Sequence, residues 1–554
     1  MSTHNVAQAL RRHAQTQPDA VALRFPVKGY RTDAPAWDAW TYRDLDHHSD
    51  AYARGFQQQG IHTGDRCLML IKPGLDFYAV VFGLFKLGAV PVVLDPGMGL
   101  PALLKCIEAN GPRVVIAEAA VHAIRTFVRR PFASAEVFVT RGTRWFWGGA
   151  NLTQCHVPSD EPFELVLREA TDDAAILFTS GSTGAAKGVA SKQAMFAAQV
   201  DALQQMFDFQ PGQVDVQCFA AFAIFDLCLG MTSVLPSMDL SKPATAKPED
   251  ILAAIHAHDA DVCFASPVVW QNVSRHALTT QATLPSVRIL LTVGAPIPAY
   301  LHRRFQQILS DGAQVWTPYG ATEGLPISWI GTEEILGGTW DRTAAGHGTC
   351  VGRIAPLAEV AIVPVTDEPM ADWSDVEPIT EPGVVGEIVV KGPQVSPEYK
   401  DADEANRQAK IRDGDGFRHR MGDLGYLDEE GRLWFCGRKK HRLQTADGML
   451  PAVPVEGVFN EHPDVFRTAL VGIGDSGSEQ PVLCVEMEPG KAWSPEVEAA
   501  LVELARGTPH DGVVQRFLHH TGFPVDPRHN SKIRREDLKV WAEARCADLL
   551  RRAS

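Results

Sequence analysis

The sequence predicts an α/β fold with more than one hydrophobic core, on three observations. Short apolar runs typical of buried strands alternate with helical patterns through much of the chain, which favours parallel sheets covered by helices. From about Thr349 the pattern changes to short strands separated by turns, which indicates a small antiparallel or barrel-like element. The length of 554 residues exceeds what a single core supports.

The alternation begins with a helical pattern at residues 42–59. Leu45, Tyr52 and Phe56 fall on one face of that helix, as a period of 3.6 residues requires. Gly88 is expected to end a later helix. The next elements are predicted in turn as a strand at 67–71, a helix at 76–87, a strand at 90–94, a helix at 101–110 and a strand at 114–117.

Residues 179–188, TSGSTGAAKG, form the stretch richest in chemistry. The stretch follows an apolar run at 174–178 that is typical of a buried strand and precedes a helical pattern at 192–207. Glycines reach backbone dihedrals that let successive N–H groups converge on one anion, while the hydroxyls and Lys187 add donors and charge. The spacing excludes a Walker A loop. We predict a strand, a phosphate-binding loop and a helix, since a plain surface turn explains this composition less well.

Further strands and helices are predicted after this loop. Strands are predicted at 262–265, 287–293 and 314–317 with helices between them, and shorter strands at 360–363, 386–391 and within 422–435. Residues 366–382 are rich in Pro, Asp and Glu and are predicted as a solvated loop. A domain boundary is predicted near Lys440, because the rest of the chain has strand and helix signals of its own.

The composition argues against several classes of protein. A net charge of −15 without a long basic run does not favour non-specific binding to nucleic acid or anionic membranes. Ten scattered cysteines without a C-x-x-C pair suggest neither a disulfide framework nor a zinc site, so we expect reduced thiols and a cytoplasmic protein. Lys86 and Asp226 interrupt the two longest apolar stretches, which therefore read as buried elements, and no transmembrane segment is expected.

Three further motifs follow the glycine-rich loop. TPYGATEG at 317–324 comes after a predicted strand, at the end where α/β sheets place ligands. MGDLGY at 421–426 is followed by Gly437-Arg438, and NSKIR occupies 530–534. Each motif alone is modest evidence: the Gly-Asp-Leu turn could simply join two strands, and a single lysine is commonly a surface residue.

In this order and at these separations, the four motifs resemble those of the adenylate-forming superfamily of acyl-CoA synthetases, peptide-synthetase adenylation domains and luciferases. The resemblance extends from about Tyr42 to Trp541. It implies a large N-terminal domain, residues 1–437, made of two α/β sheet subdomains and a small β-barrel-like subdomain. It also implies a smaller, mobile α+β C-terminal lid domain, residues 438–554, with its hinge near Lys440 and ATP and Mg²⁺ as cofactors.

The resemblance assigns a role to each matched residue on the ATP side. Tyr319, with Gly320 beside it, would stack on adenine, because a flat aromatic face suits a purine. Asp423 and Arg438 would bind the ribose hydroxyls. The β- and γ-phosphates would be held by the loop residues Thr179, Ser180, Gly181, Ser182, Thr183, Gly184 and Lys187.

The same resemblance assigns the reacting end of the site. Thr322 would contact the α-phosphate, and Glu323 would hold Mg²⁺ as a hard oxygen ligand. Lys532 would bridge the substrate carboxylate and the α-phosphate, where its charge stabilises the charge that develops during the attack on phosphorus.

Two departures from the family pattern concern the second half-reaction. Acyl-CoA ligases usually carry a histidine beside the acyl carbonyl, where this chain has Ala223, and Asp226 nearby is new. The glycine that lets the pantetheine arm pass corresponds to Asp447, and Gly448 comes one place late. A carboxylate in a narrow thiol tunnel would obstruct CoA. Adenylation is therefore expected to be intact, while thioester formation is not.

One subgroup shares these departures. The runs at 86–98, 222–227, 419–426, 433–438 and 523–530 look like the β-lactone synthetases of bacterial long-chain olefin biosynthesis. This implies that ATP activates the carboxylate of a 2-alkyl-3-hydroxy long-chain fatty acid, whose 3-hydroxyl then closes a β-lactone and releases AMP. The tethered hydroxyl has a high effective molarity, which helps offset ring strain. Asp226 is a candidate base for its proton.

Two alternatives stay open on the sequence. One is a long-chain fatty acyl-CoA ligase or acyl-AMP ligase of the same fold. The other is a non-catalytic nucleotide-binding or scaffold protein, against which the presence of Glu323, Asp423 and Lys532 speaks. The subgroup also implies a β-lactone decarboxylase and a ketoacid reductase of the same pathway as partners, and no nucleic acid.

Overall fold

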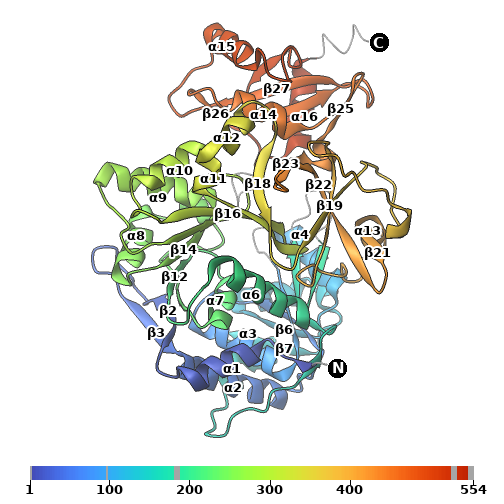
Figure 1. Ribbon diagram of the computed structural model, residues 1–554. Coiled ribbons are helices and arrows are strands. Elements are labelled where there is room, and N and C mark those ends of the chain that lie inside the picture. Colours follow the sequence, from blue (N-terminus) through green and yellow to red (C-terminus); the bar gives the residue numbers. More distant parts are fainter. Residues whose placement is uncertain (1–2, 95–97, 180–186, 526–532, 547–554) are drawn as a thin grey trace.

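The computed structural model describes residues 3–94, 98–179, 187–525 and 533–546. Its strands form a seven-stranded sheet, a 14-stranded sheet, a three-stranded sheet and two short two-stranded ladders. Figure 1 shows the first two sheets stacked through the lower and middle parts of the molecule, with the C-terminal segment above them. No helix in the described ranges is both long enough and apolar enough to cross a bilayer.

The first sheet has the strand order β11-β10-β5-β4-β6-β7-β8 and is parallel except for β11. The strands predicted at 67–71, 90–94, 114–117 and 174–178 are all confirmed here. The bounds are β4 Arg66–Leu70, β5 Val90–Val93, β6 Val114–Glu118, β7 Val137–Arg141, β8 Ala150–Asn151, β10 Asp173–Thr179 and β11 Lys187–Lys192.

Helices cover both faces of this sheet, as the continuous apolar strands predict. Successive side chains alternate between the faces, so Met69 packs in the core formed with α1, α2 and α3, while Leu68 packs in the core formed with α4. Thr41 and Asp44 form a capping box that starts α2, and Gly88 ends α3 in the left-handed conformation. The helices are α1 Ala7–Thr16, α2 Tyr42–Gln58, α3 Leu75–Leu87, α4 Leu100–Asn110 and α5 Ala119–Phe127.

The second sheet combines two parts that the sequence suggested were separate. Its order is β19-β20-β22-β23-β18-β17-β16-β15-β14-β12-β13-β2-β3, with β21 added to β22. The strands from β2 to β16 along this order are parallel neighbours, and those from β16 to β19 are antiparallel. The predicted antiparallel element is confirmed, and the β17–β18 ladder joins it to the parallel part.

The elements of this second sheet keep the predicted alternation. The parallel part and its edge comprise β2 Val21–Pro26, β3 Trp37–Thr41, β12 Val214–Gln217, β13 Thr232–Val234, β14 Val262–Ala265, β15 Ile289–Thr292 and β16 Gln314–Ala321. The antiparallel part comprises β17 Gly324–Gly331, β18 Thr349–Ile354, β19 Glu359–Val363, β20 Gly386–Lys391, β21 Lys410–Asp413, β22 Gly416–Leu427 and β23 Leu433–Arg438. The helices are α6 Gln193–Phe207, α7 Ala223–Leu229, α8 Pro248–Ala257, α9 Pro267–Thr280, α10 Ala299–Gln306, α11 Thr332–Glu334, α12 Trp340–Ala344 and α13 Asp403–Ala409.

The prediction of a strand, a loop and a helix at the glycine-rich stretch was wrong in one respect. The strand β11 lies between the loop and α6, and it pairs antiparallel with β10 from Asp173 and Lys192 to Thr179 and Lys187. The strands β10 and β11 therefore form a β-hairpin. The strand is short and begins and ends with lysine, so periodicity alone did not separate it from the start of the helix.

The C-terminal segment has its own cores, one of them beneath α14 and α15 and another beneath α16. It stands apart at the top of Figure 1, in orange and red. The boundary predicted near Lys440 falls between these cores and the rest, and stays a prediction. The elements are β24 Leu443–Thr445, β25 Gly448–Leu450, α14 Ala452–Phe459, β26 Val465–Ile473, β27 Gln480–Met487, α15 Pro495–Ala505, β28 Phe517–His519 and α16 Arg535–Arg545.

Candidate active site

The centre of the candidate site is the hairpin between β16 and β17. Tyr319 and Gly320 lie within β16, and Thr322 and Glu323 form the turn before β17. The prediction that this motif follows its strand was therefore half wrong, because the strand continues through the first residues of the motif. A Cβ on Gly320 would lie 2.7 Å from the carbonyl oxygen of Gly324, so the hairpin closes only around glycine.

Three residues that are predicted to bind the nucleoside part of ATP lie together at one end of the site. The Tyr319 hydroxyl donates to Oδ2 of Asp423 at 2.7 Å, and Nη1 of Arg438 lies 2.9 Å from Oδ1 of Asp423. Asp423 and Arg438 face each other in register on β22 and β23. Burial raises the pKa of Asp423, while the charge of Arg438 and the hydrogen bond from Tyr319 act in the opposite direction. Oδ1 of Asp423 is buried and accepts no hydrogen bond.

A second group surrounds Glu323. The Tyr399 hydroxyl donates to Oε1 of Glu323 at 2.8 Å, and the backbone N–H of Ser396 donates to the Glu323 carbonyl at 2.7 Å. Nζ of Lys187 lies 4.8 Å from the centre of the Tyr399 ring. The end of the glycine-rich hairpin and the β16–β17 turn therefore meet at Tyr399, a buried residue that the sequence did not single out.

Lys410 on β21 joins this group and was also missed. Its ammonium donates to the Ser396 carbonyl and lies 5.3 Å from the centre of the Tyr399 ring. Burial lowers the pKa of Lys410 to about 7; the charge of Glu323 opposes this shift and that of Lys187 reinforces it. No sequence signal identifies Lys410, because a lysine in a polar segment after a short helix reads as a surface residue.

Asp226 lies in a different environment. Its Oδ2 accepts a hydrogen bond from the Ser233 hydroxyl at 2.7 Å, and it interacts with Asp215 and Gln217. Burial raises the pKa of Asp226 to about 6 and raises that of Asp215 as well. These polar neighbours belong to β12 and β13, so the described contacts do not join Asp226 to the residues around Glu323. Ala223, at the start of α7, is fully buried.

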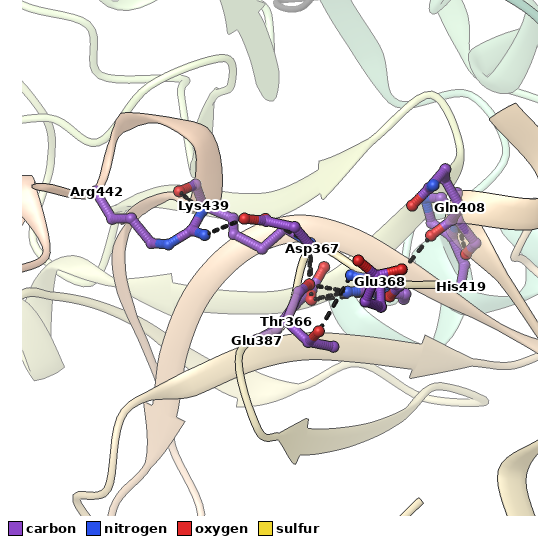
Figure 2. A network of polar contacts seen from close by, with 10 residues as sticks. Thr366, Asp367, Glu368, Glu387, Gln408, His419, Lys439 and Arg442 are labelled. Atoms are coloured by element: carbon purple, nitrogen blue, oxygen red, sulfur yellow. Dashed lines mark hydrogen bonds and ion pairs between the residues drawn. The ribbon is translucent and has the colours of Figure 1, made fainter. Parts of the chain in front are cut away.

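A buried polar network lies where the chain leaves β23 (Figure 2). Arg420 donates to the Glu387 carboxylate at 2.6 Å and to the carbonyl of Thr366 at 2.6 Å. Lys439 donates to the same Thr366 carbonyl and to Glu387, and Arg442 pairs with Asp367 at 2.6 Å. The segment 366–382 was predicted as a solvated loop. Its first residues are instead held by this network, because their carbonyls satisfy the buried guanidinium of Arg420.

The residue that follows Lys439 contacts the C-terminal segment. Lys440 pairs with Glu536 on α16, so adjacent lysines contact opposite sides of the predicted boundary. Asp447 is exposed in the turn between β24 and β25.

Several predicted residues are outside the part of the chain that the structure describes. Thr179 is the last residue of β10. Within the described ranges, no group of three or more His, Cys, Asp or Glu residues is arranged to hold a metal ion. The predicted residues outside these ranges are Ser180, Gly181, Ser182, Thr183, Gly184 and Lys532.

Comparison with known proteins identifies close relatives. The family model described as AMP-binding enzyme matches residues 10–400. An olefin beta-lactone synthetase from Xanthomonas campestris pv. campestris is 43% identical over 547 residues, covering 97% of each chain. An olefin beta-lactone synthetase from Stenotrophomonas maltophilia is 42% identical over 550 residues, covering 98% of each chain.

Solved structures agree with the fold. An amide bond synthetase from Marinactinospora thermotolerans superposes with a TM-score of 0.76 at 24% identity, covering 97% of this chain and 99% of that one. The O-succinylbenzoate coenzyme A synthetase from Bacillus subtilis, solved in complex with ATP and magnesium ion, superposes with a TM-score of 0.74 at 20% identity and with the same coverage. At such identities the likeness concerns the fold.

Proposed function

This chain belongs to the AMP-binding enzyme family, and from that premise we propose that it is an ATP-dependent β-lactone synthetase. The single observation that carries this proposal is its 43% identity, over 97% of both chains, to an olefin beta-lactone synthetase. The proposed substrate is a 2-alkyl-3-hydroxy long-chain fatty acid. The products are the β-lactone, AMP and pyrophosphate.

The residues around Asp423 fit a nucleoside. Nη1 of Arg438 lies 2.9 Å from Oδ1 of Asp423 without donating a hydrogen bond to it, so a ribose hydroxyl would supply the donor that this buried oxygen lacks. Burial raises the pKa of Asp423, and the charge of Arg438 opposes this shift. Tyr319 donates to the other carboxylate oxygen and offers an aromatic face. We propose that Gly320 lets the nucleotide approach the strand closely.

The residues around Glu323 fit a triphosphate with Mg²⁺. Glu323 would hold the metal through a hard carboxylate oxygen, and Mg²⁺ would neutralise charge on the phosphates. Tyr399 orients the Glu323 side chain by donating to one of its oxygens. Lys187 would bind the outer phosphates together with the loop residues Thr179 to Gly184, and Thr322 would contact the α-phosphate. Lys532 would stabilise the charge of the attacking carboxylate and the α-phosphate.

The chemistry has two balanced steps. A carboxylate oxygen of the substrate attacks the α-phosphorus, and the bond to the bridging oxygen breaks, which releases pyrophosphate. The 3-hydroxyl oxygen then attacks the acyl carbon of the acyl adenylate, the bond to AMP breaks, and one proton is released. Asp226 remains the proposed base, and its pKa, raised to about 6, makes it a better proton acceptor than an ordinary carboxylate.

The test uses ATP, Mg²⁺ and a 2-alkyl-3-hydroxy acid, with CoA present or absent. We expect AMP and a product lighter than the acid by one water without CoA. A thioester formed only when CoA is added would assign the chain to the acyl-CoA ligases instead. Pyrophosphate exchange into ATP should be lost in Lys532→Ala and strongly weakened in Asp423→Asn. Wild-type protein without exchange would favour a scaffold role.

The remaining assignments are part of the same proposal. Residues 438–554 would form the lid that brings Lys532 to the site. A β-lactone decarboxylase and a ketoacid reductase would act after and before this enzyme. A cytoplasmic location would suit the buried cysteines, among which no disulfide is formed.

A further inference from the structure

One surface region combines exposed aromatic rings with arginines, and its chemistry is not used by the proposed reaction. The large apolar side chains Phe127, Trp145 and Phe146 are 86%, 67% and 76% exposed. Among the described residues, they are the three most exposed large hydrophobic side chains. They lie at the end of α5 and in the segment between β7 and β8, at the edge of the first sheet opposite to β11. We call residues 125–130 and 144–147 the edge patch.

The edge patch is locally basic in an acidic protein. Residues 119–150 contain five arginines and one acidic residue, Glu136, although the whole chain has a net charge of −15. Glu136 pairs with Arg113, outside this segment. Arg130 pairs with Glu108 at the surface, whereas no ion pair is formed by Arg129 or Arg144 within the described part of the chain. Arg141 pairs with Glu118 and Asp76. Arg129 and Arg144 therefore carry positive charge that no described acidic side chain neutralises, in a chain that is acidic as a whole.

A depression of about 560 Å³ opens between the two halves of the edge patch. Arg125, Arg129 and Arg130 line one side, and Phe146 and Trp147 line the other. Nε of Arg125 is buried and donates no hydrogen bond, and burial lowers the pKa of this guanidinium. A phosphate oxygen in the depression would supply the missing acceptor and charge.

The exposed rings are presented by a fixed scaffold. Trp147 anchors their segment: its Nε1 donates to the Thr140 hydroxyl at 3.1 Å, and its carbonyl accepts a hydrogen bond from Arg125 at 2.9 Å. The rings of Trp145 and Trp147 stack with centres 6.1 Å apart. Trp145 and Phe146 therefore protrude into solvent without folding back onto the sheet, although burying them would be favourable.

We propose that the edge patch docks on an anionic lipid surface. Phe127, Trp145 and Phe146 enter the boundary between headgroups and acyl chains, where amphipathic and aromatic rings are stable. Arg129, Arg130 and Arg144 bind lipid phosphates around them. A lipid surface suits this patch better than a protein partner, because the patch exposes only three large rings beside a few arginines, whereas a stable protein interface requires a larger, complementary face. The inference uses only surface chemistry, so it does not depend on the proposed reaction.

The test is co-sedimentation of the full chain with phosphatidylcholine vesicles, with and without ~30% phosphatidylglycerol, at about 0.1 M salt. We expect wild-type protein to sediment with the anionic vesicles and to be released as salt rises. The double variant Trp145→Ala with Phe146→Ala should bind at least ~10-fold more weakly. The double variant Arg129→Gln with Arg130→Gln should bind more weakly too, and should distinguish the two vesicles less than wild type does, because only Arg144 of the three phosphate-binding arginines remains.

Matched controls change the same chemistry elsewhere. Val540→Ala removes a 66% exposed apolar side chain on α16, and Arg407→Gln removes an exposed arginine on α13; both should bind vesicles like wild type. Unchanged thermal unfolding of every variant verifies folding. Equal binding by the wild type and the Trp145/Phe146 variant would overturn the proposal. Absence of vesicle binding by the wild type would also overturn the proposal, and so would binding of a partner protein by the edge patch in place of vesicles.

Discussion

At the scale of single residues, the candidate site depends on charged groups held away from water. Asp423, Glu323 and Lys410 each contact buried partners that orient them before a substrate arrives. Such preorganisation lets a charge act on the ligand without first rearranging its surroundings. Tyr399 is the shared neighbour, because it donates to Glu323 and lies beside the ammonium groups of Lys187 and Lys410.

Lys410→Met should weaken ATP binding without unfolding the protein. The ammonium lies near Lys187 and Glu323, where the phosphates are expected, and losing a charged contact costs about 1.5–3 kcal/mol, or roughly a 10- to 100-fold rise in KM for ATP. Methionine fills the same space and removes the cost of burying a charge. The control Lys391→Met alters a partly exposed lysine paired with Asp413 and should leave KM unchanged. A KM for ATP that stays the same in Lys410→Met would contradict this role.

Asp215→Asn should change the pH dependence of stability. Burial raises the pKa of Asp215 and that of Asp226, the latter to about 6. A carboxyl with a raised pKa stabilises the fold while it is protonated, and this stabilisation is lost as the pH rises through the folded-state value. The shift of Asp226 from 3.8 to about 6 corresponds to about 3 kcal/mol. The variant should therefore be more stable than wild type at pH 8, by about 1–3 kcal/mol, and similar at pH 4.

Urea unfolding at the two pH values measures this difference. Equal slopes of stability against pH in the two proteins would contradict a raised pKa of Asp215. Asp215→Asn also concerns the proposed base of the reaction, because the amide of an asparagine at position 215 can still donate a hydrogen bond to Asp226.

At the scale of elements, buried ion pairs join segments that apolar packing alone would not align. Lys86 interrupts an otherwise apolar helix, and its ammonium is fully buried against α2, 2.6 Å from Oδ1 of Asp50 and in contact with Asp46. Arg11 on α1 pairs with the same carboxylates. The interruption that argued against a membrane span is therefore the point where three helices are joined.

Lys86→Met should destabilise the protein by about 3–5 kcal/mol, because it leaves two buried carboxylates with only Arg11 as a cation. Chemical unfolding monitored by circular dichroism measures the loss. Combining Lys86→Met with Asp50→Asn should recover part of it, since one uncompensated charge is removed. A single variant as stable as wild type would show that the network contributes little.

At the scale of the whole molecule, ion pairs hold both ends of the link between the N-terminal part and the C-terminal segment. Glu387 is 1% exposed and receives both Arg420 and Lys439, while Lys440 pairs with α16. The N-terminal side of the link is therefore rigid up to Lys439. A rotation of the lid would have to begin at Lys440 or beyond.

Glu387→Gln should loosen this link. The variant leaves Arg420 buried without its carboxylate, which costs about 3–5 kcal/mol. We expect a lower unfolding temperature and faster trypsin cleavage at Lys439 and Lys440. Asp367→Asn, which alters the exposed partner of Arg442, should change both by much less. Equal cleavage rates in wild type and Glu387→Gln would argue against the clamp.

Much of the fold could be predicted from local signals. The apolar patterns predicted the bounds of β4, α3 and β14 to within one or two residues, because each element is apolar enough to be buried on both sides. The strand β11 was missed, since its short run between two lysines has no distinctive period. The join of the antiparallel strands to the second sheet was also hidden, because pairing between β17 and β18 is a contact between segments that no local pattern records.

The sequence by itself determined the chemistry of the site: the order of the four motifs, the residues Tyr319, Glu323, Asp423 and Arg438, and the family to which they point. Only the tertiary structure decided which other groups join them. Tyr399 donates to Glu323 and Lys410 lies beside Tyr399, whereas Asp226 joins Asp215, because strand pairing and burial bring distant segments together. The spacing of residues within a motif reflects the backbone conformation that binds the ligand. The charges and burial around it arise from contacts between segments, which spacing along one chain does not specify.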